Sequence, residues 1–193
     1  MFKRKYEFKP DKTESGTLNK LYVTPKQRRS FLKWLLMAAL LTAVCVVQDV
    51  ILCKVSLFGS ALDLVPAVLL LACVIQDPEI GSIFILIGSA LYWFSGSAPG
   101  SYVIALLTVL GVLLGIVRHC YLHDSFGSAF LCAAGAVMLY ELSLFAIGLF
   151  LEYTTVSRFA GFAITGGLSV AVMPLFYPVL TAICKIGGET WNE

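Results

Sequence analysis

The sequence predicts an all-α fold, a polytopic membrane helix bundle of about six transmembrane helices with both termini in the cytoplasm. Hydrophobic residues make up 59% of the chain, whereas charged residues make up only 13%. The apolar segments each approach the roughly 20 residues that cross about 30 Å of hydrocarbon. Lysine and arginine lie mainly on one side of these segments, which predicts their orientation.

Six apolar segments divide the chain, at about 31–53, 62–76, 80–95, 101–119, 126–150 and 157–183. The second and third are short and are separated by Gln76-Asp77-Pro78-Glu79, which predicts a hairpin with its acids in water. Five crossings with one re-entrant pair are the alternative. The predicted regions are a basic cytoplasmic segment, the bundle and a short cytoplasmic tail, at 1–30, 31–185 and 186–193.

The basic residues give the orientation. Most of them precede or begin the first segment: Lys3, Arg4, Lys5, Lys9, Lys12, Lys20, Lys26, Arg28, Arg29 and Lys33. With six crossings, Arg118 and Lys185 fall on that same side, and only Lys54 and Arg158 fall on the other. This bias follows the positive-inside rule, so both termini are predicted to be cytoplasmic.

The basic residues next to the first span also suggest a partner. Lys26, Arg28, Arg29 and Lys33 lie close to the membrane, where each attracts anionic lipid by about 1 kcal/mol. The alternative is that this cluster serves only as an orientation signal. We expect anionic lipid, and no nucleic acid, at this segment.

Two carboxylates fall inside predicted spans, where an unpaired charge costs several kcal/mol. Asp49 lies four residues, or about 6 Å, before the end of its span at Cys53, so it can reach the surface beside Gln48 and Lys54. Glu141 lies nine residues, or about 14 Å, before Phe150, which places it near the bilayer centre. Glu141 therefore requires a partner within the protein.

Small residues indicate where Glu141 points. Gly127, Ala134 and Gly148 recur with it at seven-residue steps and so share one helix face. Such a face packs closely against another helix. We expect Glu141 to be protonated or hydrogen-bonded against the last span, where Thr165, Gly166 and Ser169 lie at similar depth. A proton relay would need a chain of titratable groups, so fixing the helix pairing is the preferred role.

Other short patterns predict helix contacts rather than chemistry. Gly111-x-x-x-Gly115 and Ala39-x-x-x-Ala43 let backbones approach, either inside the bundle or toward a partner protein. Pro174 and Pro178 each remove a helix hydrogen bond, which predicts a bend or an early stop.

No catalytic constellation or cofactor site emerges from the sequence, so an enzyme is not expected. The six cysteines lie in different segments without a zinc-site spacing and are interpreted as buried hydrophobic residues. His119, Cys120 and His123 cluster without a fourth ligand, and we expect no metal there.

The order of parts resembles the MreD family of rod shape-determining membrane proteins. The resemblance covers about residues 60–185 and includes LDLVPAVLLLACVIQDPEIG, GSIFILIGSALYWFSG, the turn SAPGSY and the span VIALLTVLGVLLGIVRHC. The matching positions are Asp63, Pro66, Gly81, Gly88, the turn residues Gly96, Pro99 and Gly100, then Gly115, Arg118, Pro174 and Pro178. Where the family often has a Leu-Asp pair before the turn, this chain has Tyr92-Trp93-Phe94.

The resemblance implies a non-enzymatic scaffold of the bacterial cell-elongation machinery. Its implied partners are an MreC-like bitopic protein, the complex of RodA with its penicillin-binding transpeptidase and, indirectly, the MreB filament. The family is also similar in fold to the substrate-binding subunits of energy-coupling-factor vitamin transporters, which gives the alternative function.

An enclosed outer pocket would favour the transporter alternative, because ligand sites are concave and contain a few fixed polar groups. The polar and aromatic candidates in the outer half are Asp49, Lys54, Asp63, Tyr92, Trp93, Tyr102, Glu152, Tyr153 and Arg158. The outer connections, at about 54–61, 96–100 and 151–156, are predicted to be too short for a lid. The scaffold is therefore the preferred function.

Overall fold

A computed structural model describes residues 25–54, 56–57, 60–121 and 126–186. It contains six α-helices: α1 (Pro25–Val50), α2 (Leu64–Ile75), α3 (Pro78–Phe94), α4 (Tyr102–Tyr121), α5 (Phe126–Phe150) and α6 (Phe159–Ile186). There are also two single-turn 3-10 helices in this part of the chain. η2 (Leu52–Lys54) follows α1, and η3 (Val156–Arg158) precedes α6. The strands β1 (Ser56–Leu57) and β2 (Ser60–Ala61) form a small antiparallel hairpin before α2. Each predicted apolar segment therefore contains one helix.

Three helical stretches are long and apolar enough to cross a membrane: 27–50, 126–150 and 156–186. The other three helices are shorter. At 1.5 Å per residue, the twelve residues of α2 extend only about 18 Å, well below the roughly 30 Å of a hydrocarbon core. The number of crossings therefore stays a prediction, whereas the six-helix architecture is present.

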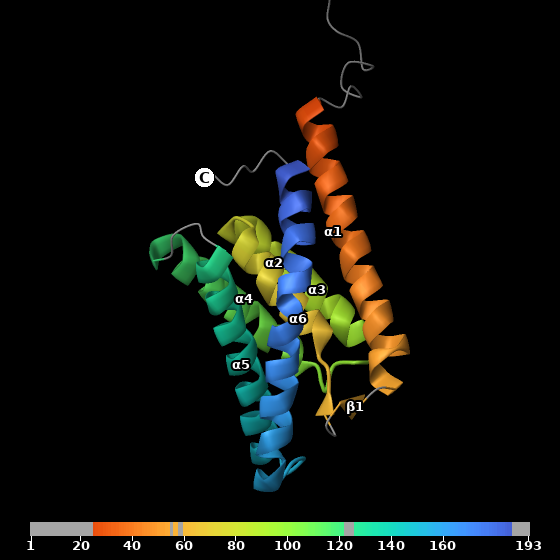
Figure 1. The fold of residues 1–193 in the computed structure, drawn as a ribbon, viewed down its shortest axis with the longest axis vertical. Coiled ribbons are helices and arrows are strands. Elements are labelled where there is room, and N and C mark those ends of the chain that lie inside the picture. Colours follow the sequence, from red (N-terminus) through yellow and green to blue (C-terminus); the bar gives the residue numbers. More distant parts are fainter. Residues whose placement is uncertain (1–24, 55, 58–59, 122–125, 187–193) are drawn as a thin grey trace, which may run out of the picture.

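The long helices α1, α5 and α6 run along the long axis of the molecule (Figure 1). α1 begins and α6 ends at the same end, while β1 and the α5–α6 connection lie at the opposite end (Figure 1). We call this second end the hairpin end. The two helix ends therefore lie on one side of the bundle, and their location in the cytoplasm stays a prediction.

The core is built around α2, which contacts every other helix. All twelve of its residues are buried, because its sequence LVPAVLLLACVI is apolar on every face. Pro66 lies in the first turn, where a missing N–H leaves no helix hydrogen bond unmade. A helix enclosed in this way cannot expose its terminal amides and carbonyls to water.

The N-terminus of α2 is satisfied by a side chain from α1. Gln48 is 7% exposed, and its Oε1 accepts hydrogen bonds from the amides of Leu64 (3.0 Å) and Val65 (2.8 Å). The Gln48 Nε2 donates to Oδ1 of Asp63, the residue preceding the helix, at 2.7 Å. Gln48 thus replaces the side-chain cap that Asp63 itself does not provide.

The C-terminus of α2 is satisfied from α4. Nη1 of Arg118 donates to the carbonyl oxygens of Val74 and Gln76, the latter at 3.1 Å. A cation at a helix C-terminus also interacts favourably with the helix dipole. From the sequence, Arg118 is interpreted only as an orientation signal. The structure adds its contact with the C-terminus of α2.

Glycines bring α3 and α4 close to their neighbours. A Cβ added at Gly111 would lie 2.4 Å from Cδ1 and 2.9 Å from Cγ2 of Ile85, which is fully buried. A Cβ added at Gly115 would lie 3.6 Å from Pro78, an ordinary van der Waals distance. The two glycines of one motif therefore differ: only Gly111 is sterically required.

Two sequence expectations differ from the structure. The early stop considered for the last span is wrong, because α6 continues through Pro174 and Pro178 to Ile186. Lys33 is 4% exposed, so it does not share the open surface of Arg28 and Arg29. The segment 1–24 and the tail 187–193 lie outside the described residues.

Replacing Gln48 by leucine should destabilise the protein. Each buried polar group left without a partner costs about 1–3 kcal/mol, and each kcal/mol lowers the thermal midpoint of a chain of this size by about 2–4 °C. The midpoint can be followed by alkylation of the buried Cys73 and Cys184 on heating. The control is Thr42→Val, because Thr42 is exposed on the same helix. Equal midpoints for the two variants would contradict the capping role.

The two glycines of α4 should respond differently to alanine. Gly111→Ala should lower the thermal midpoint, because both branches of the fully buried Ile85 would have to shift. Gly115→Ala should leave it unchanged or raise it, since alanine favours the helix by up to about 1 kcal/mol over glycine. The same thermal assay on both variants checks this, and a larger loss at Gly115 would exclude the observed α3–α4 packing.

Candidate functional site

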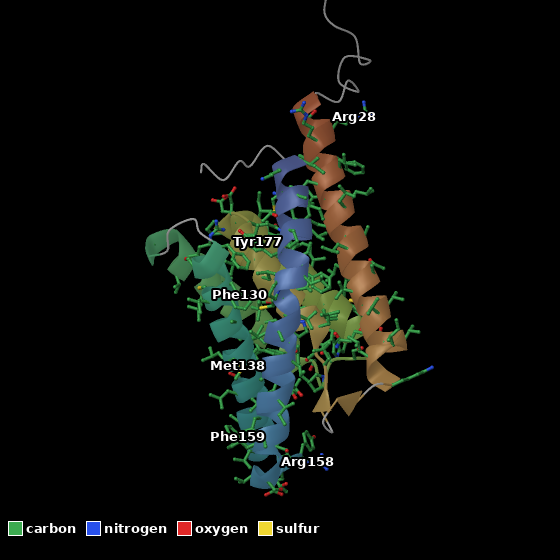
Figure 2. All side chains as sticks on the ribbon, viewed as in Figure 1. Arg28, Phe130, Met138, Arg158, Phe159 and Tyr177 are labelled. Atoms are coloured by element: carbon green, nitrogen blue, oxygen red, sulfur yellow. The ribbon has the colours of Figure 1, made fainter. Side chains whose placement is uncertain are left out.

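A cavity of about 650 Å³ reaches the hairpin end of the bundle, where its lining residue Arg158 lies (Figure 2). Its lining combines residues from α1, the segment before α2, α3 and the loop after it, α5, η3 and α6: Gln48, Leu62, Asp63, Tyr92, Ser97, Pro99, Glu141, Leu144, Arg158, Gly161, Phe162 and Thr165. We call it the outer cavity. Its volume lies within the range of about 300–1,000 Å³ that is common for ligand pockets.

Asp63 is held in place by three helices. Gln48 of α1 donates to its Oδ1 at 2.7 Å, and the Tyr92 hydroxyl of α3 donates to Oδ1 and Oδ2 at 2.9 and 3.1 Å. Ser169 of α6 donates its hydroxyl to the backbone carbonyl of Asp63 at 2.9 Å. A carboxylate that only accepts hydrogen bonds matches the ionised form. Asp63 is therefore both the start of α2 and a fixed acceptor at the cavity wall.

Glu141 is the second acid of the outer cavity. It is 4% exposed and faces α6, where a Cβ added at Gly166 would lie 3.2 Å from its Cγ. Its Oε1 has no hydrogen-bond partner among the described residues. The bonds expected with Thr165 or Ser169 are not made within this part of the chain: Ser169 bonds Asp63, while Thr165 lines the same cavity.

The charges of the outer cavity are unequally placed. Asp63 and Glu141 line its wall, and Arg158 is the lone cation among the lining residues that the structure describes. Arg158 is exposed and lies in η3 at the hairpin end, far from Arg28 at the other end (Figure 2). The interior of the cavity is therefore acidic, and its one base is in contact with solvent.

A second cavity of about 350 Å³ lies between α5 and α6, and we call it the apolar cleft. Its lining is apolar except for one acid: Gly135, Met138, Leu139, Glu141, Leu142, Phe145, Phe159, Phe162 and Ala163. Met138 and Phe159 lie along α5 and α6 between the levels of Phe130 and Arg158 (Figure 2). Glu141 and Phe162 line both cavities, so the outer cavity and the cleft are adjacent.

Three aromatic rings line the apolar cleft together with Glu141. The ring centroid of Phe145 lies 5.3 Å from that of Phe159 and 5.5 Å from that of Phe162, both in edge-on arrangements. These distances are typical of favourable aromatic pairs. The three rings therefore form an ordered wall next to Glu141.

The other predicted residues lie in different surroundings. Asp49 is half-buried and accepts a hydrogen bond from the Ser97 hydroxyl, which connects α1 to the loop after α3. Ala39 and Ala43 are exposed on the outer face of α1.

The turn residues of the resemblance connect α3 to α4. Gly96 has φ +83°, a value that favours glycine, and Pro99 lines the outer cavity. A Cβ at Gly100 would lie 2.5 Å from the Tyr102 ring. The turn also contributes Ser97 and Pro99 to the cavity wall.

Of the outer-half candidates named from the sequence, Asp63, Tyr92 and Arg158 line the outer cavity. Sequence reasoning missed Gln48, which it interpreted as a surface neighbour of Asp49. A polar residue in an otherwise apolar span was the available signal. It did not show that Gln48, rather than Asp49, points into the bundle.

The outer cavity has a volume and polar lining groups suited to binding a small molecule. Among the described residues, no group of three or more histidine, cysteine, aspartate or glutamate side chains could hold a metal ion. No family model, curated protein or solved structure matches the chain.

The two acids should respond in opposite ways to mutation. Asp63→Ala leaves Gln48 Nε2 and the Tyr92 hydroxyl without their acceptor, so the free energy of unfolding should fall by about 1–3 kcal/mol for each group. Glu141→Gln removes a buried acid whose Oε1 has no partner, so stability should be kept or increased. Thermal midpoints of both variants check this. A marked loss for Glu141→Gln would mean that Glu141 has a structural partner.

Proposed function

We propose that the chain is a multi-pass protein of the bacterial cytoplasmic membrane that acts as a non-enzymatic scaffold of the cell-elongation machinery. The proposal is supported by the resemblance of residues 60–185 to the MreD family and by one structural observation, the outer face of α1. Its partners would be an MreC-like bitopic protein and, through it, RodA with its transpeptidase and the MreB filament.

The outer face of α1 has the properties of a helix-docking surface. α1 packs inward through Met37, Leu41 and Val44, all nearly fully buried. On the opposite side, Ala39 and Ala43 are exposed and lie one turn apart. Within a membrane, small residues at this spacing let a second helix approach closely. A protein with a single span fits this face, because one helix is enough to cover it.

The same helix offers a lipid contact. Arg28 and Arg29 are exposed in its first turns, and Arg28 lies near its N-terminal end (Figure 2). With the N-terminus in the cytoplasm, these residues would meet anionic headgroups of the inner leaflet. This contact would hold α1 in the orientation that presents Ala39 and Ala43 to a partner.

The outer cavity favours a second candidate, the substrate-binding subunit of an energy-coupling-factor type transporter. Its volume suits a vitamin-sized molecule, and Asp63, Tyr92 and Arg158 are among the polar groups expected for such a pocket. The sequence-based criterion for this function was an enclosed pocket, whereas this cavity opens to the surface. The scaffold therefore remains the first proposal.

Co-purification tests the scaffold function. The chain is co-expressed with the MreC-like protein of the same genome, and recovery of that protein is quantified. We expect recovery with the natural sequence and a loss of about tenfold or more with Ala39→Leu/Ala43→Leu, because the larger side chains prevent close helix approach. The control is Ala146→Leu, which enlarges an exposed alanine on α5. Equal recovery from all three proteins, or none from any, would contradict the proposal.

A further inference from the structure

Glu141 lacks a partner that its surroundings require. It is 4% exposed, and its Oε1 makes no hydrogen bond with any described residue. A buried carboxylate without a counter-charge is strongly disfavoured, so it either holds a proton or binds a positive group. The side chain lines the outer cavity, so a positive group bound in this cavity would lie next to it.

The surroundings of Glu141 match one ligand chemistry. The rings of Phe145, Phe159 and Phe162 line the apolar cleft beside it. Aromatic rings attract organic cations through their negative faces, and quaternary ammonium groups are bound by aromatic cages in this way. A hydrated metal ion or a small inorganic anion would gain nothing from these rings.

The two adjacent cavities also specify the shape of the ligand. The outer cavity is polar and acidic, whereas the cleft is apolar, and the two share Glu141 and Phe162. A molecule that occupies both would place its charge near Glu141 and Asp63 and its hydrophobic part among the phenylalanines. An anion is disfavoured there, because two carboxylates face a single base, Arg158, among the described lining residues.

We propose that the outer cavity and the apolar cleft together bind an amphipathic organic cation, an ammonium group carrying a hydrophobic ring or chain. The site goes beyond the scaffold function and does not depend on it. It also specifies the ligand class for the second candidate, because a substrate-binding subunit with this cavity would take a cationic substrate.

Equilibrium dialysis tests the site directly. The full chain in lipid nanodiscs is dialysed against radiolabelled benzyltrimethylammonium, a permanently charged cation with one ring, and empty nanodiscs give the lipid background. We expect saturable binding above that background. Unlabelled benzyltrimethylammonium should compete, and benzenesulfonate, an anion of similar size, should not. Absence of saturable binding, or equal competition by the anion, would overturn the proposal.

One pair of variants tests the charge. Glu141→Gln keeps the shape of the side chain and removes its negative charge, so affinity for the probe should fall by about tenfold or more. Glu152→Gln makes the same charge change at an exposed position outside both cavities and should bind like the natural protein. Equal affinity of the two variants would overturn the assignment of Glu141.

A second pair tests the apolar cleft and does not alter the acid. Gly135 lines the cleft, and a Cβ added there meets nothing within 4 Å, so Gly135→Leu can fill the cleft without a clash at its Cβ. Gly127 is equally open on the same helix and lies outside both cavities, so Gly127→Leu is the control. We expect Gly135→Leu alone to weaken benzyltrimethylammonium binding, with tetramethylammonium unaffected because it has no hydrophobic group to place there. Unchanged binding to Gly135→Leu would remove the cleft from the site.

The outcomes separate this site from the proposed functions. Loss of the MreC-like partner in the Ala39→Leu/Ala43→Leu protein with retained cation binding would keep both proposals. Cation binding without recovery of any MreC-like partner would remove the scaffold function and keep the site. Recovery of the partner without saturable cation binding would do the reverse.

Discussion

The structure depends on one constraint: a twelve-residue helix is buried on every side, and its two ends have to be satisfied without water. Gln48 of α1 accepts from the first amides of α2, and Arg118 of α4 donates to its last carbonyls. Pro66 has no backbone N–H, so one amide fewer in the first turn needs a partner. Unsatisfied backbone groups in a low-dielectric interior cost several kcal/mol each, so these contacts determine which helices must lie around α2.

The same constraint creates the candidate site. Asp63 precedes α2 and accepts from Gln48 and Tyr92, so the groups that complete the helix end also form one wall of the outer cavity. Glu141 differs from Asp63, because its Oε1 takes no part in this hydrogen-bond network. One carboxylate is therefore used by the fold, and the other is available to a ligand. Buried polar groups in spans are commonly functional, and here the hydrogen bonds distinguish the two roles.

Much of the fold could be predicted from the sequence, because the apolar segments follow the helices closely and the proline-containing turn at 76–79 joins two of them. The capping of α2 could not be predicted from the sequence. Gln48 and Leu64 are sixteen residues apart, and Arg118 and Val74 are forty-four apart. A polar residue within an apolar pattern indicates burial or surface contact, but it does not identify its partner. Neighbouring residues on a helix point about 100° apart, so the predicted surface position of Asp49 does not apply to Gln48. For the site, the sequence predicted that Glu141 faces the last helix, where Gly166 of α6 lies beside it, whereas the two cavities that Glu141 lines depend on tertiary structure.

Hydrogen exchange at the start of α2 tests the central claim most directly. The full chain in nanodiscs is exchanged into deuterated buffer, and residue-resolved mass spectrometry compares the amides of Leu64 and Val65 with those in the middle of the helix. If Gln48 holds these two amides as observed, they exchange as slowly as the helix interior, because both require the same opening of the bundle. Rapid exchange of Leu64 and Val65, as at a frayed and hydrated helix end, would contradict the account.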